Sequence, residues 1–192
     1  MKLVIAEKPS VALTLAKAIG ANTKKDGYCE GNGYIVSWCV GHLIQMSNPD
    51  KINSQWKIWS LGNLPMIPKE YKYEITKATK KQYAALKKLL DSDRVDTVVN
   101  ACDAGREGEL IFRLVYNQAK CKKKIQRLWI SSMENKAIED GFKNLKDGSN
   151  YENLYKSASA RAIADWLVGM NLSRLYSCIS VSYTHLTLPT TP

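Results

Sequence analysis

The sequence has no long hydrophobic segment and no recognisable secretion signal. No apolar run approaches the roughly 20 residues that a helix needs to cross a bilayer. The short apolar run after Met1 is interrupted by the charge of Glu7, which is typical of a strand and not of a signal peptide. We therefore expect a cytoplasmic protein without a membrane partner.

Signatures of several common chemistries are also missing. The chain has no G-x-x-x-x-G-K-[ST] phosphate loop, no H-E-x-x-H and no G-x-S-x-G. The segment 31–33 lacks the third glycine and the strand-to-helix context of a dinucleotide site. The five cysteines are odd in number and share no C-x-x-C spacing, which indicates reduced thiols and not a zinc site or a disulfide framework. We expect no small-molecule cofactor, and a nucleotide-dependent oxidoreductase is disfavoured.

Positive charge, in contrast, is abundant. The chain has 28 Lys and Arg against 18 Asp and Glu, a net charge of +10 and an isoelectric point near 9.3. Such an excess favours an anionic partner, of which nucleic acid is the commonest large one. A basic surface that is merely solvated is the alternative interpretation. The length of 192 residues is enough for one domain with a core, plus an extension.

The hydrophobic pattern predicts strands that alternate with helices. Strands are predicted at 3–6, 95–99 and 125–130, with a hairpin over 27–42 that turns at 31–33. Helices are predicted over 11–19, 75–90, 110–116, 134–145 and 151 to about 176. The segment 49–73 is interpreted as an ordered loop, and 146–150 as a turn. This alternation indicates an α/β fold with a parallel sheet and helices on both faces.

An acidic, glycine-broken turn follows the predicted strand at 95–99. Asp103 lies where that strand ends, and Glu7 with Lys8 lies at the end of the first strand. Carboxyl ends of parallel strands meet at one edge of a sheet, where α/β proteins place their ligand chemistry. Carboxylates there suit Mg²⁺, which takes one or two protein carboxylates together with phosphate oxygens. Lys8 and Arg106 would offset the charge of a phosphate, so the pattern predicts phosphate chemistry on nucleic acid.

Several of these residues also have simpler explanations. Acids in the first turn of a helix complement its dipole, which is the explanation favoured for Glu109, while Glu107 fits either role. From its spacing alone, His42 fits a structural histidine better than a ligand contact. The lysine face of the helix predicted at 75–90 is typical of a solvated surface.

Five motifs in order carry a family resemblance. They are Glu7-Lys8-Pro9-Ser10, Gly41-His42-Leu43, Asp103-Ala-Gly-Arg-Glu-Gly-Glu109, Arg127-Leu-Trp-Ile-Ser-Ser132 and the run from Ser159 to Arg174. Together they resemble the N-terminal part of a bacterial type IA DNA topoisomerase of the topoisomerase III kind, over about residues 1–178. The resemblance implies a Toprim domain at 1–148 and the start of the following helical domain at 149–179. The segment 180–192, with His185 and Tyr183, resembles a non-native tail, and we exclude it from the fold prediction.

The resemblance also implies roles for particular residues. Glu7 would assist proton transfer and Lys8 would contact the scissile phosphate, while Glu7, Asp103 and Glu107 would hold Mg²⁺. Many Toprim proteins have a D-x-D pair at this turn, whereas this chain has Gly105 at the second position. The residues expected to contact DNA, mainly single-stranded, are Lys8, His42, Trp59, Arg106, Arg161, Trp166 and Arg174. For Trp166, packing within the protein is an equal alternative.

Members of this family cleave one DNA strand with a tyrosine, pass another strand through the gap and reseal it. None of the ten tyrosines here lies in the motif of that nucleophile. We therefore expect this chain to be inactive by itself. A Toprim nuclease and a non-catalytic basic DNA-binding module are the alternative functions.

Overall fold

The computed structural model describes residues 1–184, which form two compact units. The first unit comprises Met1–Gln45 and Ile75–Ser159, and the second comprises Met46–Glu74 and residues 160–184. The domain boundaries predicted from the family resemblance remain a prediction. Of the predicted non-native tail, residues 185–192 lie outside the described residues.

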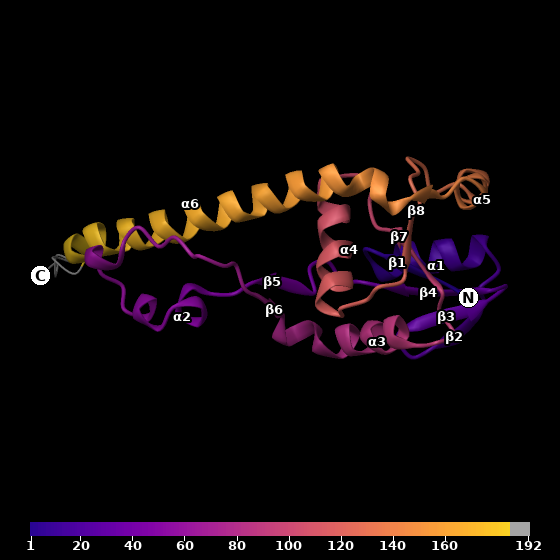
Figure 1. The fold of residues 1–192 in the computed structure, drawn as a ribbon, viewed down its shortest axis with the longest axis horizontal. Coiled ribbons are helices and arrows are strands. Elements are labelled where there is room, and N and C mark those ends of the chain that lie inside the picture. The colour runs from indigo at the N-terminus through magenta and orange to yellow at the C-terminus, as the bar shows by residue number, and fades with distance from the viewer. Residues whose placement is uncertain (185–192) are drawn as a thin grey trace, which may run out of the picture. The chain divides into compact units, whose positions relative to one another are not determined.

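A seven-stranded sheet forms the centre of the first unit (Figure 1). Its order is β2-β3-β4-β1-β7-β8-β9. The four strands β4, β1, β7 and β8 are parallel, and the edge strands β2, β3 and β9 run antiparallel to their neighbours. The strand bounds are β1 Lys2–Ala6, β2 Thr23–Lys25, β3 Tyr28–Gly31, β4 Tyr34–Trp38, β7 Thr97–Ala101, β8 Lys124–Arg127 and β9 Lys146–Asp147.

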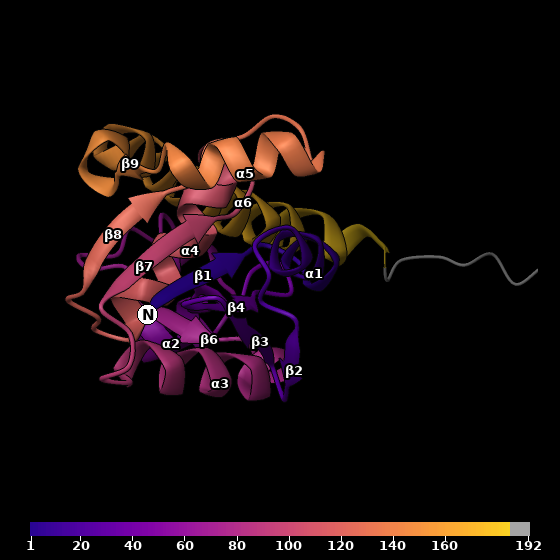
Figure 2. The same cartoon turned by 90° about the vertical axis from the view of Figure 1, so that its right-hand side faces the viewer.

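Helices cover both faces of this sheet, as predicted. Figure 2 shows α1 (Pro9–Ala18) and α5 (Asn135–Lys143) on one side of the strands and α3 (Lys80–Asp91) on the other. The helix α4 (Arg106–Gln118) follows β7 and packs against it. Side chains alternate across a strand, so Val4 and Ala6 join the core beneath α1, while Leu3 and Ile5 are buried on the opposite face.

The predicted hairpin is confirmed in β3 and β4. The two strands pair with Gly31 opposite Tyr34, leaving Asn32 and Gly33 as a two-residue turn. Both turn residues have positive φ, 47° and 79°, which Asn-Gly sequences adopt readily in hairpins. The Asn32 side chain also donates a hydrogen bond to the Ile19 carbonyl at 2.9 Å, which ties the turn to the end of α1.

The region predicted as one helix from residue 75 begins differently. Tyr73–Ile75 forms the strand β6, which pairs with β5 (Ile44–Met46), and a 3₁₀ turn, Lys77–Thr79, precedes α3. Aromatic and β-branched residues at 73–76 favour the strand. The rest of the prediction is confirmed, because Tyr83, Leu86 and Leu90 are buried and the helix lysines are exposed.

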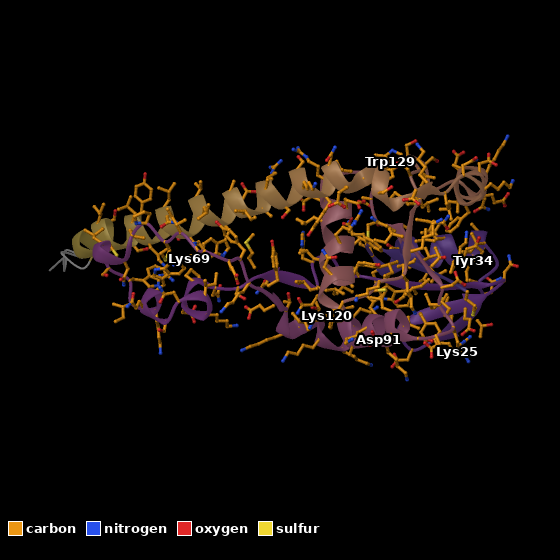
Figure 3. The ribbon with its side chains drawn as sticks, viewed as in Figure 1. Lys25, Tyr34, Lys69, Asp91, Lys120 and Trp129 are labelled. Carbon is orange, nitrogen blue, oxygen red and sulfur yellow. The ribbon has the colours of Figure 1, made fainter. Side chains whose placement is uncertain are left out.

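The predicted turn at 146–150 also contains regular structure. Lys146–Asp147 forms β9, which pairs antiparallel with β8, and Gly148–Tyr151 is a 3₁₀ turn. Pairing with β8 adds a strand that the local sequence does not signal. Lys25, Lys69 and Lys120 are exposed and contribute to the basic surface of the chain (Figure 3).

In the second unit, the segment 46–74 packs against the part of the long helix α6 (Glu152–Thr184) that follows Ser159. It contains α2 (Pro49–Ile52) and the 3₁₀ turns Ser54–Lys57 and Leu61–Asn63. The Asn171 side chain accepts a hydrogen bond from Met66 N at 2.6 Å and donates one to Met66 O at 3.1 Å, thereby fastening the loop to the helix.

The helix α6 is longer than predicted. It continues past Tyr176 to Thr184, and Pro189 is the first proline after its start. A helix stops readily at proline or glycine, and residues 177–184 contain neither. Among residues 1–184, no helix is long and apolar enough to span a membrane.

Candidate metal and phosphate site

The parallel pairing of β1 with β7 brings two predicted site residues to one edge of the sheet. Ala6, the last residue of β1, lies opposite Ala101, the last residue of β7. Glu7 leaves β1 directly after this pair, and Asp103 follows β7 by two residues. The prediction that the two strands end side by side is thus met by the register.

Glu7 carries an oxygen that lacks a partner. Its side chain is only 12% exposed, and Oε2 is buried without a hydrogen bond to any described residue. The other oxygen, Oε1, lies 3.9 Å from Nζ of Lys8, whose side chain is exposed. A buried carboxylate oxygen without a partner costs free energy, because it has lost water and gained nothing. The site therefore fits a ligand that supplies positive charge or a proton at Glu7.

Asp103 is held through its main chain, while its side chain is exposed. The carbonyl oxygen of Asp103 accepts a hydrogen bond from Nη2 of Arg127 at 2.6 Å. On the other side, the Cα of Gly108 comes so close that a Cβ there would lie 2.2 Å from the same carbonyl oxygen. The position of Asp103 is thus defined by contacts from β8 and from the first turn of α4.

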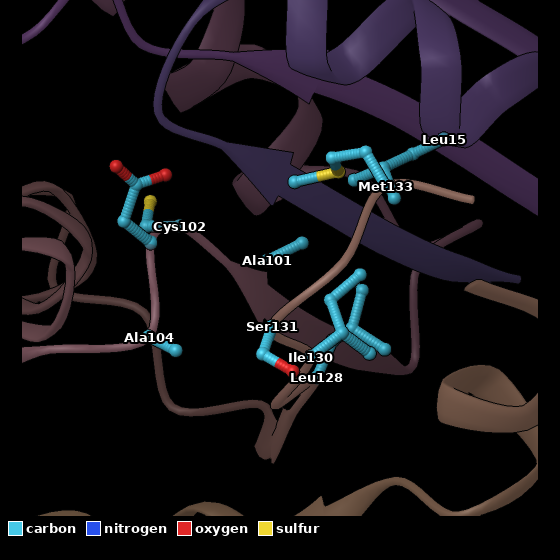
Figure 4. A pocket seen from close by; sticks show the side chains of 9 residues that line it. Leu15, Ala101, Cys102, Ala104, Leu128, Ile130, Ser131 and Met133 are labelled. Atoms are coloured by element: carbon cyan, nitrogen blue, oxygen red, sulfur yellow. The ribbon is translucent and has the colours of Figure 1, made fainter. Parts of the chain in front are cut away.

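A cavity of about 330 Å³ lies beside Asp103 (Figure 4). Cys102 and Ala104 lie on one side of it, and Leu128, Ile130 and Ser131 lie on another. Asp103 and Ser131 are its hydrogen-bonding side chains, and the remaining lining is formed by Leu15, Ala101, Cys102, Ala104, Leu128, Ile130 and Met133. The acidic turn therefore borders open space that a substrate group could enter.

Glu107 points to a different neighbour. Its Oε2 lies 3.3 Å from Nε2 of His42, and both side chains are well exposed.

In the part of the chain that the structure describes, no three His, Cys, Asp or Glu side chains form a preassembled metal site. Glu7 and Asp103 still fit Mg²⁺, which keeps several waters and needs only one or two carboxylates from the protein. Arg106, at the start of α4, is exposed.

Glu109 has a role that the sequence prediction missed. Its side chain is 1% exposed, so it is not a surface acid that only complements the helix dipole. Its Oε1 accepts from Nε of Arg113 at 2.9 Å, and its Oε2 accepts from Nδ2 of Asn100 at 2.8 Å and lies 3.3 Å from Nε of Arg127. The dipole explanation favoured for Glu109 is therefore incomplete, because this first-turn residue also belongs to a buried ion-pair network. The i, i+4 spacing of Glu109 and Arg113 could have predicted their ion pair from the sequence. The ion pair with Arg127 could not be predicted in this way, because Arg127 lies on a different element.

Cys102 lies beside this network but is unsuited to react. The thiol is buried, and its hydrogen bond with Cys39 together with burial raises the pKa of Cys102 well above its ordinary value. A thiol that stays protonated is neither a good nucleophile nor a good metal ligand. The two cysteines are free thiols, as predicted.

Four of the predicted DNA-contacting residues belong to the second unit. Trp59 is 54% exposed, and the guanidinium of Arg174 lies 5.1 Å from its ring centroid. Arg174 is itself buried and donates to the carbonyl of Trp56. Arg161 is exposed and lies 3.6 Å from Asp165. Trp59 and Arg161 are thus accessible to a partner, whereas Arg174 is buried and its guanidinium packs against the Trp59 ring.

Trp166 is buried in the second unit. Its Nε1 donates to the Ser47 carbonyl at 3.2 Å, and its ring meets Tyr71 edge to face at 6.0 Å between centroids. This placement matches the packing alternative. The contact with DNA remains a prediction, which would require the ring to leave this packing.

A mixed sheet with a parallel centre, covered by helices and bearing acidic residues at two adjacent strand ends, is the architecture of a Toprim domain. The Toprim domain family matches residues 2–133, and the chain belongs to this family. The chain is 52% identical over 173 residues to DNA topoisomerase 3 of Shouchella clausii, covering 90% of this chain and 24% of that protein. It is 49% identical over 172 residues to DNA topoisomerase 3 of Bacillus licheniformis, with the same coverage.

A solved structure supports the fold. Full-length topoisomerase I of Thermotoga maritima matches with a TM-score of 0.60 at 20% identity, covering 91% of this chain and 26% of that protein. At this identity the likeness concerns the fold alone. The chain spans about a quarter of the length of the curated relatives it matches.

Proposed function

We propose that this chain is the metal- and DNA-binding N-terminal part of a type IA topoisomerase of the topoisomerase III kind. The observation that carries the proposal is the buried, unpartnered Oε2 of Glu7 at the end of β1, beside the end of β7 that leads to Asp103. The similarity to proteins named DNA topoisomerase 3 supports the same conclusion. In the whole enzyme the reaction would be Mg²⁺-dependent cleavage of one DNA strand, strand passage and religation.

The residues of the site divide this work among them. Glu7 and Asp103 would hold Mg²⁺, and Glu107 would join them on leaving His42. When bound, Mg²⁺ supplies positive charge that offsets the charge on a reacting phosphate. Lys8 and Arg106, both exposed at this edge, would bind phosphate oxygens. Glu7 would also move a proton at the scissile ribose oxygen, for which its buried oxygen is suitably unpartnered.

The DNA that this chain binds would be mainly single-stranded. The net charge of +10 favours a polyanion, and the exposed ring of Trp59 offers a stacking surface for an unpaired base. His42 and Arg161 are exposed and would add contacts to the strand. Since no tyrosine of this chain lies in the nucleophile motif of the family, we expect the chain alone neither to cleave nor to relax DNA.

Calorimetric titration with Mg²⁺ tests the metal site. The Glu7→Gln, Asp103→Asn double variant is expected to lose the binding that the wild-type chain shows. The matched control is Asp26→Asn with Glu139→Gln, which removes the same charge from exposed positions that do not line the cavity beside Asp103. Equal Mg²⁺ binding by the wild-type chain and the Glu7, Asp103 variant would refute the site.

Two assays separate the proposal from the alternative functions. Binding of single-stranded DNA without any Mg²⁺ binding would identify a non-catalytic DNA-binding module. Nicking of single-stranded DNA, or relaxation of supercoiled plasmid, by the purified chain with Mg²⁺ would contradict the expected inactivity, and nicking alone would favour a nuclease.

A further inference from the structure

We propose that Arg127 is a positioning residue that sets the place of Asp103 for metal binding. This inference rests on the proposed function, because it assumes that Asp103 is a Mg²⁺ ligand. Arg127 itself is 1% exposed and would touch neither the metal ion nor DNA. It would act through the main chain of the acidic turn.

The guanidinium of Arg127 holds the carbonyl groups at the end of β7. Its Nη1 lies 3.0 Å from the Asn100 carbonyl oxygen and 2.7 Å from that of Cys102. Its Nη2 donates to the Asp103 carbonyl at 2.6 Å. Three carbonyls of the segment 100–103 therefore converge on one rigid cation, just where the strand ends and the acidic turn begins.

The side chain of Asn100 extends the same arrangement. Its Oδ1 lies 3.3 Å from Nη1 of Arg127 and accepts a hydrogen bond from the Cys102 amide at 3.0 Å. Its Nδ2 donates to Glu109. The main chain before Asp103 is thus tied to Arg127 directly and through Asn100, so the backbone of Asp103 has little freedom.

Arg127 is in turn fixed by its own neighbours. Its Nε lies 3.3 Å from Oε2 of Glu109, and its guanidinium lies 5.1 Å from the ring centroid of Trp129 and 5.9 Å from that of Tyr151. Burial lowers the pKa of Arg127 below its ordinary value, and the Glu109 carboxylate opposes that change. A planar cation held between aromatic rings and a carboxylate keeps its donors aimed in one direction.

A lysine could replace the charge of Arg127 but not its shape. A single ammonium group cannot bridge the carbonyls of Asn100, Cys102 and Asp103 as a planar fork with several donors does. Residues that orient metal ligands typically change metal affinity by about 10- to 100-fold when they are mutated. Arg127→Lys is therefore expected to weaken Mg²⁺ binding by about tenfold or more.

Arg113 provides a matched control. It is also buried and also pairs with Glu109, but its other contacts are the Gly148 carbonyl at 2.9 Å, Glu152 at 3.3 Å and the Tyr155 ring, whose centroid lies 5.6 Å from the guanidinium. No hydrogen bond or ion pair of Arg113 in the described residues involves Asp103. Arg113→Lys should therefore lower stability through the shared network while leaving Mg²⁺ affinity within about twofold of wild type.

The experiment measures Mg²⁺ affinity by calorimetry on the 192-residue chain, with folding checked by circular dichroism. Amide exchange over 102–105 is followed without metal, so that the turn is monitored independently of binding. The expected result is weaker binding and faster exchange in Arg127→Lys but not in Arg113→Lys. Combined with Asp103→Asn, the lysine substitution should cause no further loss of affinity. If Arg127→Lys fails to fold, Arg127→Gln, which keeps a planar donor, takes its place.

The results of this experiment distinguish failure of the positioning role from failure of the proposed metal site. Wild-type Mg²⁺ affinity in Arg127→Lys, or equal weakening in the Arg127 and Arg113 variants, would overturn the positioning role and leave the proposed metal site intact. Absence of Mg²⁺ binding by the wild-type chain would overturn the proposed metal site and this inference together.

Discussion

Gly108 and Asp103 are in such close contact that no side chain fits between them. A Cβ on Gly108 would lie 2.2 Å from the Asp103 carbonyl oxygen and 2.7 Å from its nitrogen, both of them main-chain atoms. Such atoms can yield only if the acidic turn moves. Gly108→Ala is therefore expected to destabilise the chain by about 1–3 kcal/mol, as overpacking does, and to weaken Mg²⁺ binding.

Gly105 is the control for this substitution. A Cβ there would meet nothing within 4 Å, and its φ of 178° is an extended conformation open to any residue. Urea unfolding and Mg²⁺ titration of Gly105→Ala should match wild type. Equal effects of the two alanine substitutions would show that the contact at Gly108 does not matter.

The open space at Gly105 allows a test for gain of affinity. The D-x-D pair implied by the family resemblance has a carboxylate at this position, and Gly105→Asp would introduce one two residues after Asp103 without a steric clash. Because the number of charged ligands tunes affinity for a hard cation, we expect Mg²⁺ to bind about tenfold more tightly. Gly105→Asn, which has the same shape without the charge, is the control. Unchanged affinity in Gly105→Asp would place the metal ion away from this turn.

The pKa of Tyr116 leads to a prediction about the stability of the folded chain at alkaline pH. Burial, followed by the neighbouring Cys121, raises the pKa of Tyr116 from 10.0 to about 12, and its hydroxyl donates to the Lys123 carbonyl at 2.6 Å. The folded chain therefore holds this proton more tightly than the unfolded chain. The resulting stability is complete below pH 10 and is lost as the pH rises towards 12.

The comparison of wild type with Tyr116→Phe isolates this effect. Urea unfolding between pH 9 and 12 should show a smaller loss of stability in the variant than in wild type, since phenylalanine has no proton to lose. Parallel curves for the two proteins would contradict the assignment of that pKa to the folded state.

Substitution of Trp59 tests whether the second unit binds single-stranded DNA by stacking. Its exposed ring rests on the guanidinium of Arg174 and is available for stacking on a base. Trp59→Ala should weaken binding of an oligothymidine by about 1–3 kcal/mol, the range for one base stacked on an aromatic ring. Ile58→Ala removes a neighbouring exposed side chain without a ring and should have little effect. Fluorescence anisotropy at fixed salt measures both, and equal losses would argue against stacking.

Much of the fold was predictable because it depends on local patterns. The Asn32-Gly33 turn, the apolar face of α3 and the alternation of strands with helices all follow from residues close together in the sequence. The strand β6 was missed because its partner β5 lies about 30 residues earlier, and pairing decides its conformation. The short β9 was missed for the same reason.

The sequence by itself determined the chemistry at the edge of the sheet: carboxylates at Glu7 and Asp103, basic residues at Lys8 and Arg106, and glycine at 105 and 108. Only the tertiary structure decided which groups hold the turn. Glu109 was expected to complement a helix dipole, yet it lies buried between Arg113 and Arg127. Arg127 reaches Asp103 from another strand, 24 residues away in sequence. Burial and long-range pairing depend on how strands are ordered in the sheet, and no local pattern of residues specifies that order.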